Sequence, residues 1–226
     1  MTNTIKMVVF DLAGTTLNEQ NVVYKTLCKA IVNHGIDTNL QLVLKLGAGK
    51  EKHQAIKDIV QFSAPDKIRE SHLIFKNFKA MLNKAYQKLE VLPVKGVEEV
   101  LLKLRKDQII VVLNTGYDRR IACTLLKKIG WSEKFMYDLL ITASDVEKTR
   151  PYPDMIKKAM RKFNITDPLK VLKAGDSAVD IEEGKNAKCG ITVGVLSGAQ
   201  SQEQLKSAKP DYIISSLSEL YKKVLL

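Results

Sequence analysis

The sequence predicts an α/β protein in which a parallel sheet, covered by helices on both faces, is interrupted by an all-helical insertion. Short apolar runs rich in β-branched residues alternate with helical patterns along most of the chain, an order typical of parallel sheets. The runs are almost entirely apolar, as expected of strands buried on both faces. The interval from about residue 17 to residue 92 departs from this alternation, because it contains helical patterns and no convincing strand.

The predicted strands recur from the start of the chain to its end. They are Ile5–Phe10, Ile109–Leu113, Leu139–Thr142, Lys170–Ala174, Ile191–Leu196 and Tyr212–Ile214. Between the later runs, apolar residues three and four positions apart predict the covering helices, for example at Ile121, Leu125 and Ile129. A turn signal at Pro93–Gly96 precedes the first of these helices.

Four helical patterns fill the interval that lacks strands. They are Val22–Asn33, Leu40–Leu46, Lys50–Val60 and a long one over Pro65–Leu89. An insertion of about 75 residues after the first strand is long enough to form a small domain of its own. We therefore predict a catalytic core made of residues 1–17 and 93–226, and a helical cap domain made of residues 18–92.

The composition narrows the class of protein. The chain has 226 residues, 45% of them hydrophobic, so it can bury a core without disulfides. Its cysteines, Cys28, Cys123 and Cys189, lie far apart, which fits free thiols in a reducing cytosol. No apolar run approaches the roughly 18 residues of a membrane span, and the first residues do not resemble a signal peptide. We expect a cytoplasmic protein with no membrane partner.

The net charge of +11 is the one unusual feature of the composition. The lysines are scattered at helical spacing and are not interleaved with aromatic residues, and no nucleic-acid-binding motif occurs. We interpret the charge as a solvated surface that attracts phosphate anions. The expected partner is a small phosphorylated or phosphonate substrate and not a nucleic acid, and the chain is expected to be a monomer or a homodimer.

Four polar clusters lie at or beyond strand ends, where parallel sheets bind their ligands. They are Asp11 with Ala13-Gly14-Thr15-Thr16, Thr115 with Asn114 and Gly116, Arg150 in Arg150-Pro151-Tyr152-Pro153, and Gly175-Asp176-Ser177-Ala178-Val179-Asp180. Each cluster alone has a simpler explanation, because an aspartate at a strand end is often a helix cap and a single arginine is often a surface cation. The four together, in this order, favour one shared site.

The residue types in this set suit attack on phosphorus. Asp11 and Asp176 supply the hard oxygen ligands that Mg²⁺ prefers, and a carboxylate such as Asp11 can also act as a nucleophile. Thr115 and the neighbouring amide can hold a phosphoryl oxygen. Arg150 can neutralise the charge that develops during transfer. Ser177 is expected to support this set from outside, as is Asp180, or to reach the metal through water.

The motifs resemble those of haloacid dehalogenase-superfamily hydrolases that carry an inserted helical cap of the first type. The resemblance covers the whole chain, with VVFDLAGTT, LNTG, RPYP and GDSAVD as the four motifs. It implies a Rossmann-like core, Mg²⁺ held by Asp11, the backbone carbonyl of Ala13 and Asp176, and an aspartyl-enzyme intermediate hydrolysed by water. Substrate-binding positions in the same motifs are Gly14, Thr15 and Gly116.

Ala13 narrows the range of possible substrates further. Phosphatases of this superfamily usually carry a second aspartate there, and general acid catalysis is worth about 10²–10⁴ in rate. The phosphonatase branch, which cleaves the carbon–phosphorus bond of phosphonoacetaldehyde, is similar in its DxAGTT pattern and uses a cap lysine that forms an imine with the aldehyde.

The GxxKxxH cap segment of that branch resembles Gly47–His53, so Lys50 is the candidate amine. Gly49 allows a tight loop, Lys50 opens a helix, and His53 shares its face. Gly49 and His53 are expected to bind substrate. A contact with a substrate anion is the alternative role of Lys50. The tail GVLSGAQSQEQL is closer to the group of phosphonatase-like hydrolases, whose substrates the resemblance does not define.

Several functions remain open at this point. The leading one is a phosphonatase-like hydrolase that acts on a small phosphonate. A phosphomonoester phosphatase, with another group replacing the acid missing at Ala13, is the first alternative. A catalytically degenerate ligand-binding member is the second, although such a protein has no need of the intact set. A dehalogenase is the least favoured, because those enzymes work without a metal and the pairing of Asp11 with Asp176 would have no use.

Overall fold

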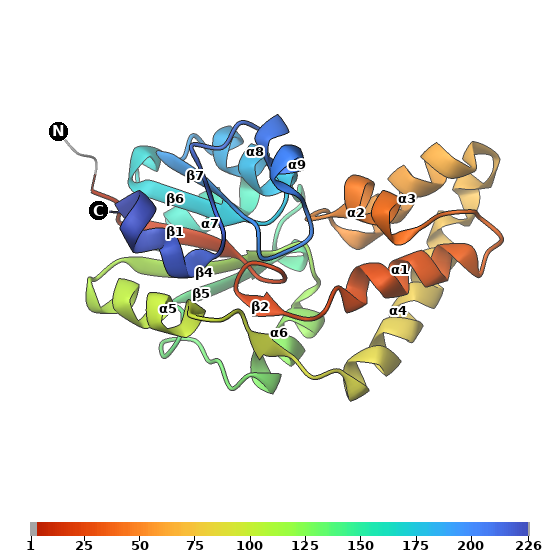
Figure 1. Ribbon diagram of the computed structural model, residues 1–226, viewed down its shortest axis with the longest axis horizontal. Helices are drawn as coiled ribbons and strands as arrows, with labels where there is room; N and C mark the ends of the chain where they lie inside the picture. Colours follow the sequence, from red (N-terminus) through yellow and green to blue (C-terminus); the bar gives the residue numbers. More distant parts are fainter. Residues whose placement is uncertain (1–3, 226) are drawn as a thin grey trace.

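The structure, a computed structural model, describes residues 4–225 and confirms the α/β class (Figure 1). Within those residues a six-stranded sheet has the order β5-β4-β1-β6-β7-β8, and every neighbouring pair is parallel. Its strands are β1 (Met7–Asp11), β4 (Ile110–Thr115), β5 (Leu139–Thr142), β6 (Val171–Gly175), β7 (Ile191–Val195) and β8 (Tyr212–Ile214). All six lie within two residues of the predicted runs.

Helices cover both faces of this sheet, as its apolar strands require. The core helices are α5 (Val97–Lys106), α6 (Arg119–Lys128), α7 (Asp154–Lys162), α8 (Ala178–Asn186) and α9 (Gln202–Ser207). Successive residues of a strand point to opposite faces, so Phe10 packs in one cluster with Leu101 and Leu125, and Val9 packs in another with Met155. The sheet is therefore buried from both sides.

The helical insertion is confirmed as well, and it extends from one end of the sheet (Figure 1). It comprises α1 (Val22–Val32), α2 (Leu40–Gly47), α3 (Lys52–Ser63), a 3-10 helix (Pro65–Glu70) and α4 (Ser71–Lys88). The single helix expected over Pro65–Leu89 is thus two elements, since Pro65 starts a separate short helical turn. Leu27 of α1 and Phe78 of α4 are fully or almost fully buried, which gives the insertion an apolar interior.

Two very short strands join the insertion to the core. β2 (Leu17–Asn18) pairs antiparallel with β3 (Leu92–Pro93), with Leu17 opposite Pro93 and Asn18 opposite Leu92. The sequence did not predict them, because two residues cannot display an alternating pattern. The division into core and cap domains at these positions stays a prediction. No helix of residues 4–225 has the length and apolar character needed to cross a membrane.

Candidate active site

Three of the predicted side chains meet at the carboxyl edge of the sheet. Asp11 ends β1, Thr115 ends the neighbouring strand β4, and Asp176 follows β6 on the other side of β1. Each of them is at most 5% exposed. Burial raises the pKa of Asp176 well above its usual range, and the charge of Asp11 raises it further. The two carboxyl groups are therefore within electrostatic reach of each other.

Arg150 joins this group from the loop that precedes α7. Its Nη1 donates to Oδ1 of Asp11 at 2.6 Å, and its Nε donates to Glu183 at 3.0 Å. Its Nη2 donates to the carbonyl and to the side-chain oxygen of Asn114 at 2.9 and 2.6 Å. The planar guanidinium is thus fixed on three sides. Among residues 4–225 no hydrogen bond reaches Oδ2 of Asp11, so this oxygen is available for attack or for metal binding.

Lys173 is a further member of the site that the sequence prediction missed. It lies in the middle of β6, is fully buried, and donates to the side-chain oxygen of Asn114 at 2.7 Å. Its Nζ is also 2.9 Å from Asp180 and 3.4 Å from Glu183. The available signal was a single lysine inside an otherwise apolar strand, because a buried ammonium needs ionic partners.

Asp180 belongs to this ion-pair network. Its Oδ2 accepts a hydrogen bond from Ser177 at 2.5 Å, and its Oδ1 lies 2.9 Å from Arg150 as well as from Lys173. Burial opposes ionisation, but the two cations hold the pKa of Asp180 below its usual range. Ser177 and Asp180 therefore support the arginine and the lysine, and a contact of Asp180 with a metal through water stays a prediction.

The charges of the site fit a divalent cation. Four buried carboxyl groups lie with two buried cations, and the charges of Asp11 and Asp180 raise the pKa of Asp176, a repulsion that a divalent cation would relieve; the groups are Asp11, Asp176, Asp180 and Glu183, with Arg150 and Lys173. No group of three or more His, Cys, Asp or Glu side chains arranged for a metal occurs in residues 4–225, and the ligand set of Asp11, Asp176 and the Ala13 carbonyl stays a prediction. Two carboxylates and a carbonyl are a suitable oxygen set for Mg²⁺.

The loop after β1 is shaped around Asp176. Gly14 has a φ of +85°, and a Cβ there would lie 2.3 Å from an Asp176 oxygen, so neither the backbone conformation nor the space allows a side chain. The hydroxyl of Thr15 is buried without a partner among the residues described. The Thr115 hydroxyl accepts from the Tyr117 amide at 3.2 Å. These polar groups suit the binding of phosphoryl oxygens.

The structure does not bring Lys50 into this site. Its ammonium is 2.5 Å from Asp58, and its side chain is 27% exposed. Lys50 also does not open α3, because the Glu51 side chain caps that helix by accepting from the amides of His53 and Gln54, and the helix begins at Lys52. The predicted helix start at Lys50 is therefore wrong by two residues, and the predicted role of Lys50 toward substrate stays a prediction.

His53 also points elsewhere. Its ring stacks on Phe75 of α4 with centroids 4.9 Å apart, and burial lowers its pKa. Its Nε2 is buried with no partner among the described residues. This position is inside the cap and does not support the predicted contact with substrate.

Lys52, and not Lys50, is the first residue of α3. It is only 5% exposed, and its ammonium lies 5.0 Å from the ring centre of Tyr24 and 5.2 Å from that of Tyr117. It donates to the carbonyl of Lys50 at 2.6 Å. Burial lowers its pKa to about 8, against the opposing charge of Asp11. The cap thus places a buried amine with a lowered pKa beside Tyr24 and Tyr117.

The cap loop that carries these residues lies directly on the core. Gly49 has a φ of +72° and donates to the Tyr24 hydroxyl at 3.0 Å, and a Cβ on it would lie 2.2 Å from the Ser177 hydroxyl. A Cβ on Gly116 would lie 2.9 Å from the carbonyls of Gly49 and Lys50. The structure therefore shows the cap in contact with the core, over the carboxyl edge of the sheet.

A small pocket adjoins Lys52 between cap and core. Its volume is about 150 Å³, and its walls are mostly apolar, with Phe75, Phe78 and Leu82 from the cap and Tyr117 from the core. This volume is below the usual range of about 300–1,000 Å³ for pockets that bind drug-sized ligands. The space suits a substrate with a very small organic part.

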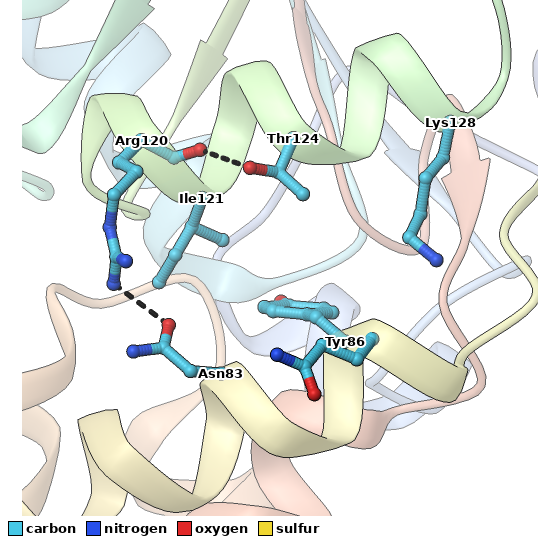
Figure 2. A pocket seen from close by; sticks show the side chains of 7 residues that line it. Asn83, Tyr86, Arg120, Ile121, Thr124 and Lys128 are labelled. Atoms are coloured by element: carbon cyan, nitrogen blue, oxygen red, sulfur yellow. Dashed lines mark hydrogen bonds between the residues drawn. The ribbon is translucent and has the colours of Figure 1, made fainter.

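A second pocket, of about 370 Å³, lies between α4 and α6 (Figure 2). Asn83 and Tyr86 of α4 face Arg120, Ile121 and Thr124 of α6 across it (Figure 2). Arg120 donates to the side-chain oxygen of Asn83 at 2.8 Å. None of its lining residues belongs to the predicted site, so this pocket is part of the contact between cap and core and not of the chemical centre.

Comparison with known proteins agrees with these features. The haloacid dehalogenase-like hydrolase family matches residues 5–188. A phosphonoacetaldehyde hydrolase of Latilactobacillus sakei is 28% identical, over 96% of this chain and 93% of its own. A phosphonoacetaldehyde hydrolase of Lactiplantibacillus plantarum is 30% identical, over 87% of this chain and 77% of its own.

Solved structures share the fold. A phosphonoacetaldehyde hydrolase like protein from Oleispira antarctica superposes with a TM-score of 0.82 at 22% identity, covering 96% of this chain and 90% of its own. A structure described as a predicted phosphoglycolate phosphatase from Haemophilus somnus has a TM-score of 0.78 at 21% identity and covers 98% of both chains. At these identities the likeness concerns the fold alone.

Proposed function

The chain belongs to the haloacid dehalogenase-like hydrolase family, and from this premise we propose that it is a magnesium-dependent, phosphonatase-like hydrolase that cleaves a small phosphonate aldehyde. The observation that carries the proposal is the buried cap amine of Lys52, whose pKa is lowered by burial and raised in part by the charge of Asp11. The named relatives from two lactic acid bacteria support the same substrate class.

In this proposal Asp11 is the nucleophile. Arg150 fixes Oδ1 of Asp11, so that Oδ2 is directed at phosphorus, and Thr115 with the loop of Gly14 and Thr15 holds the phosphoryl oxygens. Magnesium, held by Asp11, Asp176 and the Ala13 carbonyl, would neutralise part of the phosphoryl charge. Water then hydrolyses the aspartyl intermediate, which requires the cap to open or to admit a water molecule.

Lys52 replaces Lys50 as the candidate imine-forming residue. Its amine would condense with the substrate aldehyde, and the protonated imine would accept the electron pair that the carbon–phosphorus bond releases. This removes the need for the acid that is missing at Ala13, because the leaving carbon has an electron sink and no alkoxide is expelled. The small pocket beside Lys52 matches a two-carbon organic part better than a large one.

The test is borohydride reduction in the presence of phosphonoacetaldehyde, followed by peptide mass mapping. Cleavage after Glu51 separates Lys50 from Lys52, so the two candidates fall on different peptides. We expect the label on Lys52, lost in Lys52→Met and retained in Lys50→Met. A label on Lys50 would restore the assignment made from the sequence, and phosphate release without any label would end the imine mechanism.

A phosphomonoester phosphatase is the second candidate, because the arrangement of Asp11, Arg150 and Thr115 would serve an ester equally well. A neighbour in the solved structures is described as a phosphoglycolate phosphatase. Ala13 counts against this function, since no acid follows the nucleophile at the usual position. Rapid turnover of simple phosphate esters that is unaffected by Lys52→Met would favour it.

A further inference from the structure

The loop that joins β7 to α9, residues 196–201, contacts the predicted metal site and has no part in the mechanism above. The Ser197 hydroxyl donates to the carbonyl oxygen of Gly14 at 2.7 Å, in the loop after β1. The Ala199 amide donates to Oδ2 of Asp176 at 2.6 Å, in the segment after β6. The β7–α9 loop therefore joins the two segments that carry the predicted metal ligands.

One oxygen of the Asp176 carboxyl group is enclosed by backbone. A Cβ on Gly14 or on Gly198 would overlap Oδ2, so neither residue can carry a side chain while this oxygen keeps its position. The Ala199 amide donates to the same oxygen. No hydrogen bond within residues 4–225 reaches the other oxygen, Oδ1. Asp176 thus has one oxygen that the protein holds and one that it leaves without a partner.

Asp11 is held in the same manner, because Arg150 donates to its Oδ1 and no hydrogen bond in the described part of the chain reaches its Oδ2. Two carboxylates that each offer one oxygen suit Mg²⁺, which requires near-octahedral geometry at about 2.1 Å. Ca²⁺ takes about six to eight oxygens and often binds both oxygens of a carboxylate. A carboxyl group with one enclosed oxygen therefore favours the smaller ion.

The side chain of Gln200 fixes the β7–α9 loop to the start of α8. Ser177, the N-cap residue of that helix, makes no capping hydrogen bond with its side chain. The Gln200 side-chain oxygen instead accepts from the first amide of the helix, that of Ala178, at 2.6 Å. Since Gln200 follows Ala199 and Ala178 lies two residues after Asp176, this hydrogen bond supports the contact between Ala199 and Asp176.

We propose that the β7–α9 loop makes Asp176 selective for Mg²⁺ over Ca²⁺, with Gln200 as the positioning residue. The Ala199 amide and the two glycines keep Oδ2 from a cation, so that Asp176 offers Oδ1 alone. Gln200 holds the loop on the Asp176 segment and is not itself a ligand. The inference rests on the metal dependence in the proposed function and does not depend on the cap amine.

The experiment measures cation binding to the full chain without substrate. Bound Mn²⁺ is followed by electron paramagnetic resonance and displaced by Mg²⁺ or by Ca²⁺, which gives a Kd for each ion. Gln200→Ala removes the acceptor of the Ala178 amide, and Ala199→Pro removes the donor to Asp176, because proline has no amide hydrogen. Both variants should bind Mg²⁺ about tenfold more weakly and Ca²⁺ no more weakly than the parent.

Two further variants separate this role from a general effect on the loop. Gln200→Glu keeps an oxygen that can accept from the Ala178 amide, so it should bind Mg²⁺ at least as tightly as the parent. Gln202→Ala removes an exposed glutamine two residues further on and should leave both Kd values unchanged.

The ratio of the two Kd values decides the outcome, in Gln200→Ala alone if circular dichroism shows that Ala199→Pro does not fold. A ratio equal to that of the parent, whether both affinities stay the same or fall together, would overturn the inference and leave the proposed function standing. A parent that does not bind Mg²⁺ would refute the metal dependence in the proposed function, and the inference with it.

Discussion

Replacing Lys173 by Met is expected to destabilise the fold by about 3–5 kcal/mol, because it removes one partner of a buried ion-pair network. The Lys173 ammonium lies 2.9 Å from Asp180 and 3.4 Å from Glu183, and all three side chains are 0% exposed. Methionine fills nearly the volume of the lysine stem, so the loss is electrostatic and leaves little cavity. In a chain of this size each kcal/mol lowers Tm by about 2–4 °C, which gives a decrease of about 6–20 °C.

The assay is thermal unfolding followed by circular dichroism at neutral pH, with Lys170→Met as the control. The Lys170 ammonium is 4.0 Å from Asp167 on the surface, and both side chains are more than a third exposed, so its replacement should change stability by less than about 0.5 kcal/mol. Equal Tm values for Lys173→Met and the parent would refute the ion-pair argument.

The same variant has a defined pH dependence. Against the effect of burial, Arg150 and Lys173 hold the pKa of Asp180 below its usual range, so Asp180 stabilises the parent above the ordinary aspartate pKa and loses this contribution as the pH falls. The stability gap between parent and Lys173→Met should therefore narrow in acid. A gap that widens as the pH falls would contradict the assignment.

Further expected outcomes concern turnover and the cap. Asp11→Asn should abolish turnover, because an amide is a poor nucleophile, and activity within about tenfold of the parent in a phosphate-release assay would contradict the mechanism. EDTA should abolish turnover, and added Mg²⁺ should restore it. Turnover that does not change on chelation would exclude the metal assignment. Arg120→Ala removes the 2.8 Å hydrogen bond to Asn83 between cap and core. It should raise KM by favouring the open cap and should change Tm by no more than about 2 °C. An unchanged KM would show that this hydrogen bond does not hold the cap closed. Between pH 4 and pH 8 the free energy of unfolding of Glu19→Gln should rise by about 3 kcal/mol relative to that of the parent, as measured by urea unfolding. The pKa of Glu19 is raised from 4.5 to about 7, so the parent loses stability as the pH rises through this range. Stability curves of the two proteins that run parallel would refute this.

The sheet and the polar edge were predictable because each depends on a local signal. A buried strand such as β7 must be an apolar run, and parallel strands bring their carboxyl ends to one edge whatever their order. Asp11, Thr115 and Asp176 were therefore found together from their positions after such runs. Lys173 carried a signal too, a cation within an apolar strand, but its partners on α8 could be known only from the packing of that helix on β6.

Which of the two neighbouring cap lysines is buried could not be predicted from spacing. Lys50 and Lys52 differ by two positions, and the choice depends on where α3 begins, which the side chain of Glu51 decides by capping the helix. Because α3 begins at Lys52, Lys50 lies in the loop before the helix, with its ammonium at Asp58, whereas Lys52 is buried.

The pairing of Leu17–Asn18 with Leu92–Pro93 brings the entry and the exit of the helical insertion side by side, about 5 Å apart as opposite strands are. The core sheet can therefore form with a different segment inserted between these two points, provided that the ends of the inserted segment lie side by side. In the proposed function the insertion also supplies Lys52, so a different insertion at these two points would change the chemistry of the protein together with its substrate.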